Sequence, residues 1–259
     1  MKVVIFAGGL GTRLSEETHL KPKPMVEVGG VPILWHIMKI YATQGYNDFI
    51  ICLGYKGYLI KEYFINYFHH HSDLTVDLAT NQVKIHNTNS EKFIVTLVET
   101  GLNTKTAGRL KRIEKYIDGD HFMLTYGDGV ADIDIKALEK FHLEHGKIGT
   151  VTSVQPEGRF GGMEFGQTNE VSSFKEKPQG DGHWINGGFF VLKKEIFDIL
   201  PDNCDDEMWE ESPMETLISR KELMAYKHNG FWRCMDALRD KVILDELWQS
   251  GNAKWKNWS

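Results

Sequence analysis

The stretch Val3-Val4-Ile5-Phe6-Ala7-Gly8-Gly9-Leu10-Gly11-Thr12-Arg13-Leu14 decides the fold of this chain. Its first five residues are apolar, which is typical of a strand buried on both faces of a parallel sheet. The glycines that follow let the backbone turn sharply and bring its N–H groups close to an anion, because no Cβ obstructs the approach. Arg13 adds a planar cation that suits phosphate oxygens. We therefore expect a phosphate-binding loop after the first strand, with a plain glycine-rich turn as the alternative.

The segment Lys21-Pro22-Lys23-Pro24-Met25 follows within ten residues. Pro22 and Pro24 restrict the backbone on both sides of Lys23, so this lysine is presented from a stiff loop. The combined segment is neither a P-loop nor the dinucleotide fingerprint, because it lacks the closing Lys-Ser/Thr pair and the required glycine spacing. We expect Lys23 and Arg13 to serve a triphosphate site of another type.

Strand and helix patterns alternate along the chain, which predicts an α/β fold with a mixed, mostly parallel, Rossmann-like sheet flanked by helices. Further strands are expected at residues 49–53, 93–98, 122–126, 148–154 and 184–192, and a hairpin at 74–78 and 83–86. Helices are expected at residues 32–43, 57–68, 105–117, 134–145, 213–222 and 236–250. Because open α/β sheets bind ligands beyond the carboxyl ends of their strands, the first loop and Asp128 should meet there.

Composition excludes several classes of function. The chain has 259 residues, 41% of them hydrophobic and 25% charged, which suits a globular protein with a full core. A net charge of −6, spread along the chain, gives no sign of a nucleic-acid partner. No stretch is long and apolar enough for a signal peptide or a membrane span. Three widely spaced cysteines predict reduced thiols in a cytoplasmic protein.

The opening segment resembles the sugar-nucleotidyltransferases, which join a sugar 1-phosphate to a nucleotide. The likeness continues to the end of the chain and narrows to members that use CTP and glucose 1-phosphate. The segments that carry it are Glu99-Thr100-Gly101, Gly108-Arg109-Leu110-Lys111-Arg112, Thr125-Tyr126-Gly127-Asp128-Gly129-Val130-Ala131-Asp132, Gly158-Arg159-Phe160-Gly161, Phe174-Lys175-Glu176-Lys177-Pro178, Ile185-Asn186-Gly187-Gly188-Phe189-Phe190, Gly230-Phe231-Trp232, Met235-Asp236 and Leu238-Arg239-Asp240-Lys241. The resemblance implies one nucleotidyltransferase domain over residues 1–259. Within it we expect a nucleotide-binding core at 1–154, a small sugar-binding β lobe at 155–192 and a C-terminal helical part at 193–259.

The reaction that the resemblance implies is attack of the sugar phosphate on the α-phosphorus of CTP, with pyrophosphate leaving. The attacking phosphate is already largely ionised at neutral pH, since its second pKa is about 6, so no general base is needed. Alignment and charge stabilisation are needed instead, and two carboxylates are the usual protein share of a Mg²⁺ site. Asp128 and Asp236 are the expected metal ligands. The alternatives are a turn-forming role for Asp128 and an N-cap role for Asp236.

The family pattern implies roles for further residues. Lys23 would contact the phosphates at the reacting centre, and Arg13 the phosphates that leave; with Asp128 they form the expected catalytic set. The nucleotide is expected at Ala7, Gly8, Gly9, Leu10, Gly11, Thr12, Arg13, Thr104, Gly108, Arg109 and Gly127. The sugar phosphate is expected at Lys23, Gly161, Glu176, Lys177, Asn186 and Gly187.

Two positions depart from the family pattern: Ala107 stands where glycine is expected, and Ala237 where threonine is expected. Neither removes a catalytic group. Two alternatives to the CTP reaction stay open: the same chemistry with dTTP or UTP, and a non-catalytic nucleotide-binding regulatory module. The family also implies a homo-oligomer, and a product that feeds deoxyhexose synthesis for O-antigen (lipopolysaccharide).

Remaining clusters have structural explanations. His69-His70-His71 lies at an expected helix end, where a metal site is the less favoured interpretation. Trp35 and His36 are expected to pack inside an amphipathic helix. Trp255 and Trp258 near the C-terminus are expected to pack against the body or a neighbouring subunit.

Overall fold

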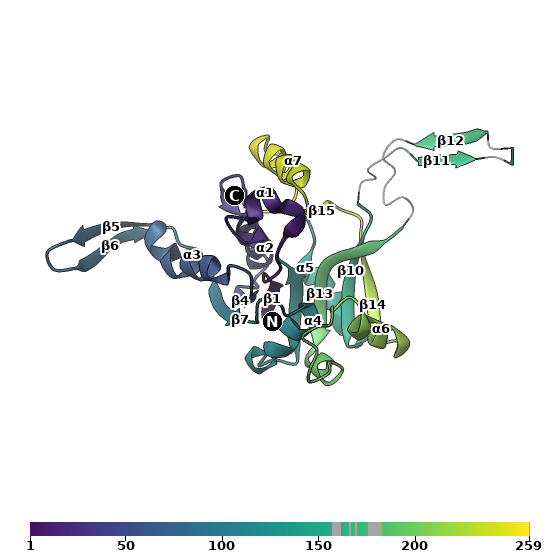
Figure 1. Ribbon diagram of the computed structural model, residues 1–259, viewed down its shortest axis with the longest axis horizontal. Coiled ribbons are helices and arrows are strands. Elements are labelled where there is room, and N and C mark those ends of the chain that lie inside the picture. The colour runs from purple at the N-terminus through teal and green to yellow at the C-terminus, as the bar shows by residue number, and fades with distance from the viewer. Residues whose placement is uncertain (157–161, 166, 169, 176–182, 259) are drawn as a thin grey trace.

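The computed structural model describes residues 1–156, 162–165, 167–168, 170–175 and 183–258 (Figure 1). At its centre lies a seven-stranded sheet in the order β14-β10-β13-β8-β1-β4-β7. These strands are β1 (Val3–Phe6), β4 (Asp48–Leu53), β7 (Ile94–Glu99), β8 (His121–Tyr126), β10 (Gly149–Val154), β13 (Ile185–Lys193) and β14 (Leu223–His228). Neighbours run parallel except β13, which is antiparallel to both β8 and β10. The expected mixed, mostly parallel sheet is confirmed.

The apolar run of β1 is explained by its position between two cores. Val3 and Ile5 belong to one buried cluster, with side chains of α2 (Ile33–Ala42), α3 (Gly57–His70), α5 (Ile135–His145) and α7 (Leu238–Gln249). Val4 and Phe6 belong to the other, with side chains of α4 (Thr106–Arg112) and α6 (Ser212–Ser219). Each buried Val or Ile contributes about 1.5–3 kcal/mol to folding. Alternate residues of β1 therefore hold helices against both faces of the sheet.

The sheet order places a switch point beside β1. From β1 the chain adds β4 and then β7 on one side, and it returns to add β8 on the other. Phe6, the last residue of β1, lies opposite Tyr126, the last residue of β8. The loops after these two strands therefore leave the sheet side by side, which is the usual place for a ligand in such folds.

Short elements surround the central sheet. Four two-stranded sheets pair β2 (Glu27–Val28) with β3 (Val31–Pro32), β5 (Ser72–Asp77) with β6 (Gln82–Thr88), β9 (Gly129–Ala131) with β15 (Trp232–Cys234), and β11 (Gly162–Phe165) with β12 (Val171–Lys175). In the described part of the chain, the remaining helical turns are η1 (Thr12–Leu14), α1 (Ser15–Thr18), η2 (Lys23–Met25), η3 (Glu114–Tyr116) and η5 (Lys194–Asp198). Figure 1 shows β5 and β6 extending from the end of α3, away from the central sheet.

Several features differ from the expectations. The edge strand β14 and the pair β9–β15 were not predicted. The helix expected at 105–117 ends at Arg112, because the Ile113 N–H donates to the Leu110 carbonyl at 3.2 Å and tightens the turn into η3. The helix expected from Asp236 begins at Leu238.

Candidate active site

The glycine loop after β1 follows a path that close contacts fix. A Cβ on Gly8 would lie 2.0 Å from the Arg109 guanidinium, so only glycine fits there. Gly11 has a φ of +63°, in the left-handed region that favours glycine, and a Cβ there would lie 2.8 Å from Thr18. These contacts fix the path of the loop, and therefore the position of Arg13 in η1 relative to the end of β1.

Lys23 begins the 3-10 helix η2 between two prolines. Pro22 is extended, with φ −66° and ψ 150°, and Pro24 occupies the first turn, where no backbone N–H donor is needed. The Lys23 side chain is only 14% exposed. The stiff segment expected from the sequence thus presents a partly buried ammonium group rather than a solvated one.

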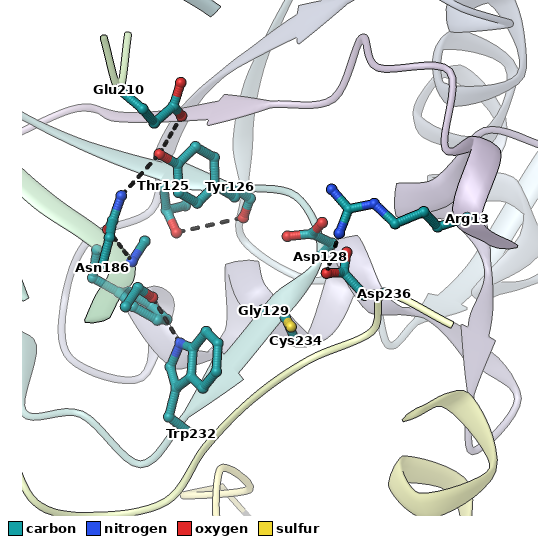
Figure 2. Close-up of a pocket in the computed structure, with 13 residues that line it drawn as sticks. Arg13, Thr125, Tyr126, Asp128, Gly129, Asn186, Glu210, Trp232, Cys234 and Asp236 are labelled. Atoms are coloured by element: carbon teal, nitrogen blue, oxygen red, sulfur yellow. Dashed lines mark hydrogen bonds and ion pairs between the residues drawn. The ribbon is translucent and has the colours of Figure 1, made fainter. Parts of the chain in front are cut away.

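Four charged side chains converge beyond the ends of β1 and β8. Lys23 Nζ donates to Asp128 Oδ2 at 2.6 Å and to Asp236 Oδ1 at 2.7 Å. Arg13 Nη1 donates to Asp236 Oδ2 at 2.7 Å. Figure 2 shows Arg13, Asp128 and Asp236 gathered at one side of a cavity. The structure brings together both expected cations and both expected metal ligands from four separate segments.

Electrostatics keep Lys23 charged. Burial is the largest single influence on its pKa and lowers it, but the attraction and hydrogen bonds of Asp128 and Asp236 together outweigh burial. The net result is a pKa above the ordinary lysine value. At neutral pH the cluster therefore holds a lysine cation between two carboxylates, each about a quarter exposed.

The pair β9–β15 sets the distance between the two aspartates. Asp128 lies between β8 and β9, and its carbonyl accepts from the Met235 N–H at 2.8 Å. Gly129 lies opposite Cys234 in the antiparallel register. Asp236 follows directly, so backbone pairing rather than side-chain contact alone holds the carboxylates close together.

Asp236 is not the N-cap of α7. The N-cap position belongs to Ala237, and the Asp240 side chain accepts from the backbone N–H groups of both Asp236 and Ala237. Asp240 thus accepts the hydrogen bonds of the free N–H groups at the start of α7. The Asp236 carboxylate is not needed for this and instead contacts Lys23 and Arg13. The N-cap alternative for Asp236 is therefore wrong.

A cavity of about 320 Å³ lies beside the cluster. Its lining includes Asn186 and Gly187, two of the expected sugar-site residues, together with Asp128 and Asp236. The Gly187 carbonyl accepts from the Trp232 indole N–H at 2.7 Å, which fixes this part of β13 against β15. A Cβ on Gly187 would meet Val154 at 2.8 Å, so the position is also closely packed from below.

Arg109 lies under the glycine loop. Its guanidinium donates to the carbonyls of Gly8, Leu53, Gly101 and Leu102, and to the Thr100 hydroxyl. The residue is 4% exposed, and burial lowers its pKa. Arg109 thus joins the loops after β1, β4 and β7 from beneath.

Other expected nucleotide-site residues lie on or before α4. Thr104 is buried, and Gly108 packs so closely on Asp205 that a Cβ would meet its backbone at 2.8 Å. Ala107 is fully buried, and its N–H donates to the Glu207 carbonyl at 3.1 Å. The methyl group of Ala107 is therefore accommodated within the second core.

Three expected sugar-site residues, Gly161, Glu176 and Lys177, lie outside the described residues. Within the described part of the chain, no group of three or more His, Cys, Asp or Glu side chains is arranged to hold a metal ion. His71 instead stacks on Tyr67 at the end of α3. All three cysteines are free thiols.

Among the cavity-lining residues that sequence reasoning missed are Tyr126 and Glu210. Tyr126 ends an apolar strand and is indistinguishable from a core residue by pattern. Glu210 belongs to an acidic stretch that begins at Asp205 and is typical of a solvated surface. Neither position gives a sequence signal of its own.

Comparison with known proteins identifies the family. The model of the nucleotidyl transferase family matches residues 2–238. A glucose-1-phosphate cytidylyltransferase of Salmonella typhi is 58% identical over 259 residues, covering all of both chains. A probable glucose-1-phosphate cytidylyltransferase of Bacillus subtilis is 43% identical over 258 residues, again over the full length of both. In the described part of the chain, no helix is long and apolar enough to cross a membrane.

Solved structures show the same fold. The crystal structure of HddC from Yersinia pseudotuberculosis superposes with a TM-score of 0.68 at 25% identity, covering 95% of this chain and 99% of that one. The family match, the full-length relatives and the fold all indicate the same family. The chain therefore belongs to the nucleotidyl transferase family, as a relative of the glucose-1-phosphate cytidylyltransferases.

Proposed function

We propose that the protein transfers a cytidylyl group from CTP to α-D-glucose 1-phosphate, giving CDP-glucose and pyrophosphate. The observation that carries this proposal is the convergence of Arg13, Lys23, Asp128 and Asp236 beside a cavity of about 320 Å³. The full-length relatives with 58% identity support the choice of base and sugar.

The residues of the cluster align and stabilise rather than remove a proton. The attacking phosphate is already ionised near neutral pH, since its second pKa is about 6. Lys23, kept charged by its two aspartates, is placed to neutralise charge at the phosphate that is attacked. Arg13, whose side chain is 78% exposed, is placed to bind the phosphates that leave.

The donor set of the cluster suits Mg²⁺. Asp128 and Asp236 lie within 2.7 Å of one ammonium nitrogen, so their oxygens are close enough to share a cation. Two carboxylates with substrate phosphates and waters are a common Mg²⁺ environment. When bound there, the ion would neutralise charge on the phosphate oxygens. Asp128 and Asp236 are the residues that would hold it.

The loop residues Ala7 to Arg13 and Gly127 are proposed to surround the nucleotide, with Thr104, Gly108 and Arg109 on the side of the base and ribose. Asn186 and Gly187 are proposed to bind the sugar, together with Gly161, Glu176, Lys177 and the Lys23 side chain. Support for the sugar side comes from the lining of the cavity by Asn186 and Gly187.

We further propose a cytoplasmic location, a homo-oligomeric state and a role in supplying deoxyhexoses for O-antigen. The free thiols of Cys52, Cys204 and Cys234 support a reducing compartment. The oligomeric state can be measured by light scattering during gel filtration.

The testing experiment is pyrophosphate release by the purified protein with Mg²⁺ and glucose 1-phosphate, supplied with CTP, UTP, dTTP, ATP and GTP separately. We expect release with CTP at a rate at least tenfold above any other triphosphate. A preference for dTTP or UTP would support the proposed type of reaction but contradict the choice of CTP as the nucleotide. If no pyrophosphate were released with any of the five triphosphates, the proposal would be contradicted. A nucleotide-binding titration would then test whether the protein is a non-catalytic nucleotide-binding module.

A further inference from the structure

Glu210 is the end point of a hydrogen-bond network at the side of the cavity away from the charge cluster. Figure 2 shows Glu210, Tyr126 and Asn186 together on one side, and Arg13, Asp128 and Asp236 on the other. Asn186 Nδ2 donates to the Tyr126 hydroxyl at 3.2 Å, and this hydroxyl donates to Glu210 Oε1. The Asn186 Oδ1 atom accepts from the Gly188 N–H at 2.8 Å, which fixes the orientation of the amide.

A second branch reaches Glu210 from α4. The Thr106 hydroxyl donates to Glu210 Oε2 at 2.9 Å and accepts from the Trp209 N–H at 2.7 Å. Tyr126 and Thr106 both donate, so Glu210 accepts a hydrogen bond at each of its two carboxylate oxygens. Burial and the nearby Glu210 charge raise the pKa of Tyr126, so its hydroxyl keeps the proton that it donates.

The segment that carries Glu210 is attached to α4 over several residues. Lys105 N donates to the Asp205 carbonyl at 2.7 Å, and Arg112 Nη2 donates to Asp205 Oδ2 at 2.5 Å. Gly108 packs directly on Asp205. Glu210 therefore reaches the cavity from a backbone segment that these contacts hold against α4.

A carboxylate has about four lone-pair sites, and the two hydroxyl donors use two of them. Glu210 can therefore accept further hydrogen bonds. Its side chain lines the cavity on the same side as Asn186. We propose that Glu210 determines the hydroxyl specificity of the sugar site: it accepts a hydrogen bond from a ring or exocyclic hydroxyl of the sugar phosphate, and through Tyr126 it holds Asn186 in place. This inference deepens the proposed function and rests on it.

The test compares glucose 1-phosphate with its 2-, 3-, 4- and 6-deoxy analogues in the CTP reaction. A site built to bind a hydroxyl rejects the analogue that lacks it. For the wild type we expect at least one analogue to lose about tenfold or more in kcat/KM, as expected for a hydrogen bond to a charged acceptor. Glu210→Gln places an amide donor where Tyr126 or Thr106 needs an acceptor.

In Glu210→Gln we expect kcat/KM for glucose 1-phosphate to fall by about tenfold or more. The analogue that the wild type rejects should then be used within about twofold of glucose 1-phosphate, because the discriminating acceptor is lost. The KM for CTP should change by less than about twofold, since Glu210 is on the sugar side. A merely structural role would lower all rates and leave the analogue ratios unchanged.

Glu211→Gln is the matched control, because this neighbouring carboxylate is exposed. It should behave as the wild type with every analogue. Should Glu210→Gln fold poorly in thermal unfolding, Glu210→Asp keeps the charge but withdraws it by one methylene, and the same loss of discrimination is expected.

Two results would overturn the inference while the proposed function stands: wild-type discrimination that persists in the Glu210 variants, or a wild type that rejects none of the analogues. Failure of the proposed function is separate, because the wild type would then make no CDP-glucose from CTP and glucose 1-phosphate.

Discussion

Lys23 contacts Asp128 and Asp236 at once, and this arrangement determines what each of the three residues contributes. A single ammonium group holds the two carboxylates together. Without a cation between them, the carboxylates would repel each other. The lysine thus keeps the metal-ligand pair close together while it carries the charge that the transferring phosphate requires.

Asp128→Asn tests this arrangement at its first carboxylate. The amide oxygen can still accept from Lys23, so the fold should persist, but one negative charge for the cation is lost. We expect Mg²⁺-dependent turnover to fall by at least about a hundredfold, comparable to removal of one transition-state-stabilising group. Pyrophosphate release over a Mg²⁺ titration measures this. Asp132→Asn, four residues further on and hydrogen-bonded to His228 instead, is the control. Unchanged turnover in Asp128→Asn would refute its assignment.

The Arg109 guanidinium donates hydrogen bonds to several segments of the chain rather than to a single neighbour. Its acceptors are four backbone carbonyls and one hydroxyl, at the end of β4 and in the loops after β1 and β7. Arg109→Met would leave several of these buried acceptors without this donor. We expect the free energy of unfolding to fall by about 3 kcal/mol and the KM for CTP to rise. Urea unfolding and steady-state kinetics measure the two effects. A variant with wild-type stability would show that the carbonyls find other donors.

At the scale of elements, α2 and the C-terminal segment meet at a neutral histidine. His36 is fully buried, and its Nε2–H donates to the Val28 carbonyl at 2.8 Å. The Trp255 indole N–H donates to His36 Nδ1 at 3.4 Å. Both ring nitrogens are therefore used in the neutral form, and protonation at Nδ1 would set two donors against each other. Trp248 and Trp258 enclose the same ring.

Burial lowers the pKa of His36 to about 4, against an ordinary value of 6.5. The unfolded chain therefore binds a proton before the folded protein does, and stability is lost as pH falls from about 6.5 towards 4. We expect the free energy of unfolding to decrease by about 2 kcal/mol on this account between pH 7.5 and pH 5.0. Urea unfolding at both pH values, with wild type and His36→Gln, isolates the effect. An equal pH dependence in both proteins would contradict it.

Elements with a strong period were predictable, and those set by tertiary pairing were not. The apolar run of β1 and the helix expected at residues 134–145 follow from local patterns, and both are present. The strand β15 has three residues, too few to show a period, and forms because β9 pairs with it. This unpredicted pair is also what aligns Asp128 with Asp236. Arg13 and Lys23 were thus identified from the chemistry of their loops, and Asp128 and Asp236 with the help of the family pattern, whereas the backbone pair that holds the aspartates required the structure.

At the scale of the whole molecule, the C-terminal segment closes one of the two cores. Trp255 is 1% exposed and stacks on Phe231, whereas Trp258 is only partly buried. Of the two expected possibilities, packing against the body or against a neighbouring subunit, the structure shows packing against the body. Tyr126 and Glu210, by contrast, became recognisable only once distant segments were seen to meet around the cavity.

Trp255→Ala should lower the free energy of unfolding by about 3–5 kcal/mol, the usual cost of removing a buried Trp side chain. Trp258→Ala, its matched control, should cost clearly less because its side chain is already partly exposed. Urea unfolding at pH 7.5 compares them. Equal losses in the two variants would show that the C-terminal segment unfolds as a unit.

The charge cluster also ties function to the order in which the chain is made. Lys23 and Asp128 are 105 residues apart, and Lys23 and Asp236 are 213 apart. Contacts of such high sequence separation form late, after the loop-closure entropy between them has been overcome. A nascent chain from which Asp236 has not yet emerged therefore has its glycine loop and Lys23, but only one of the two carboxylates. We expect products of translation that stop before Asp236 to be inactive.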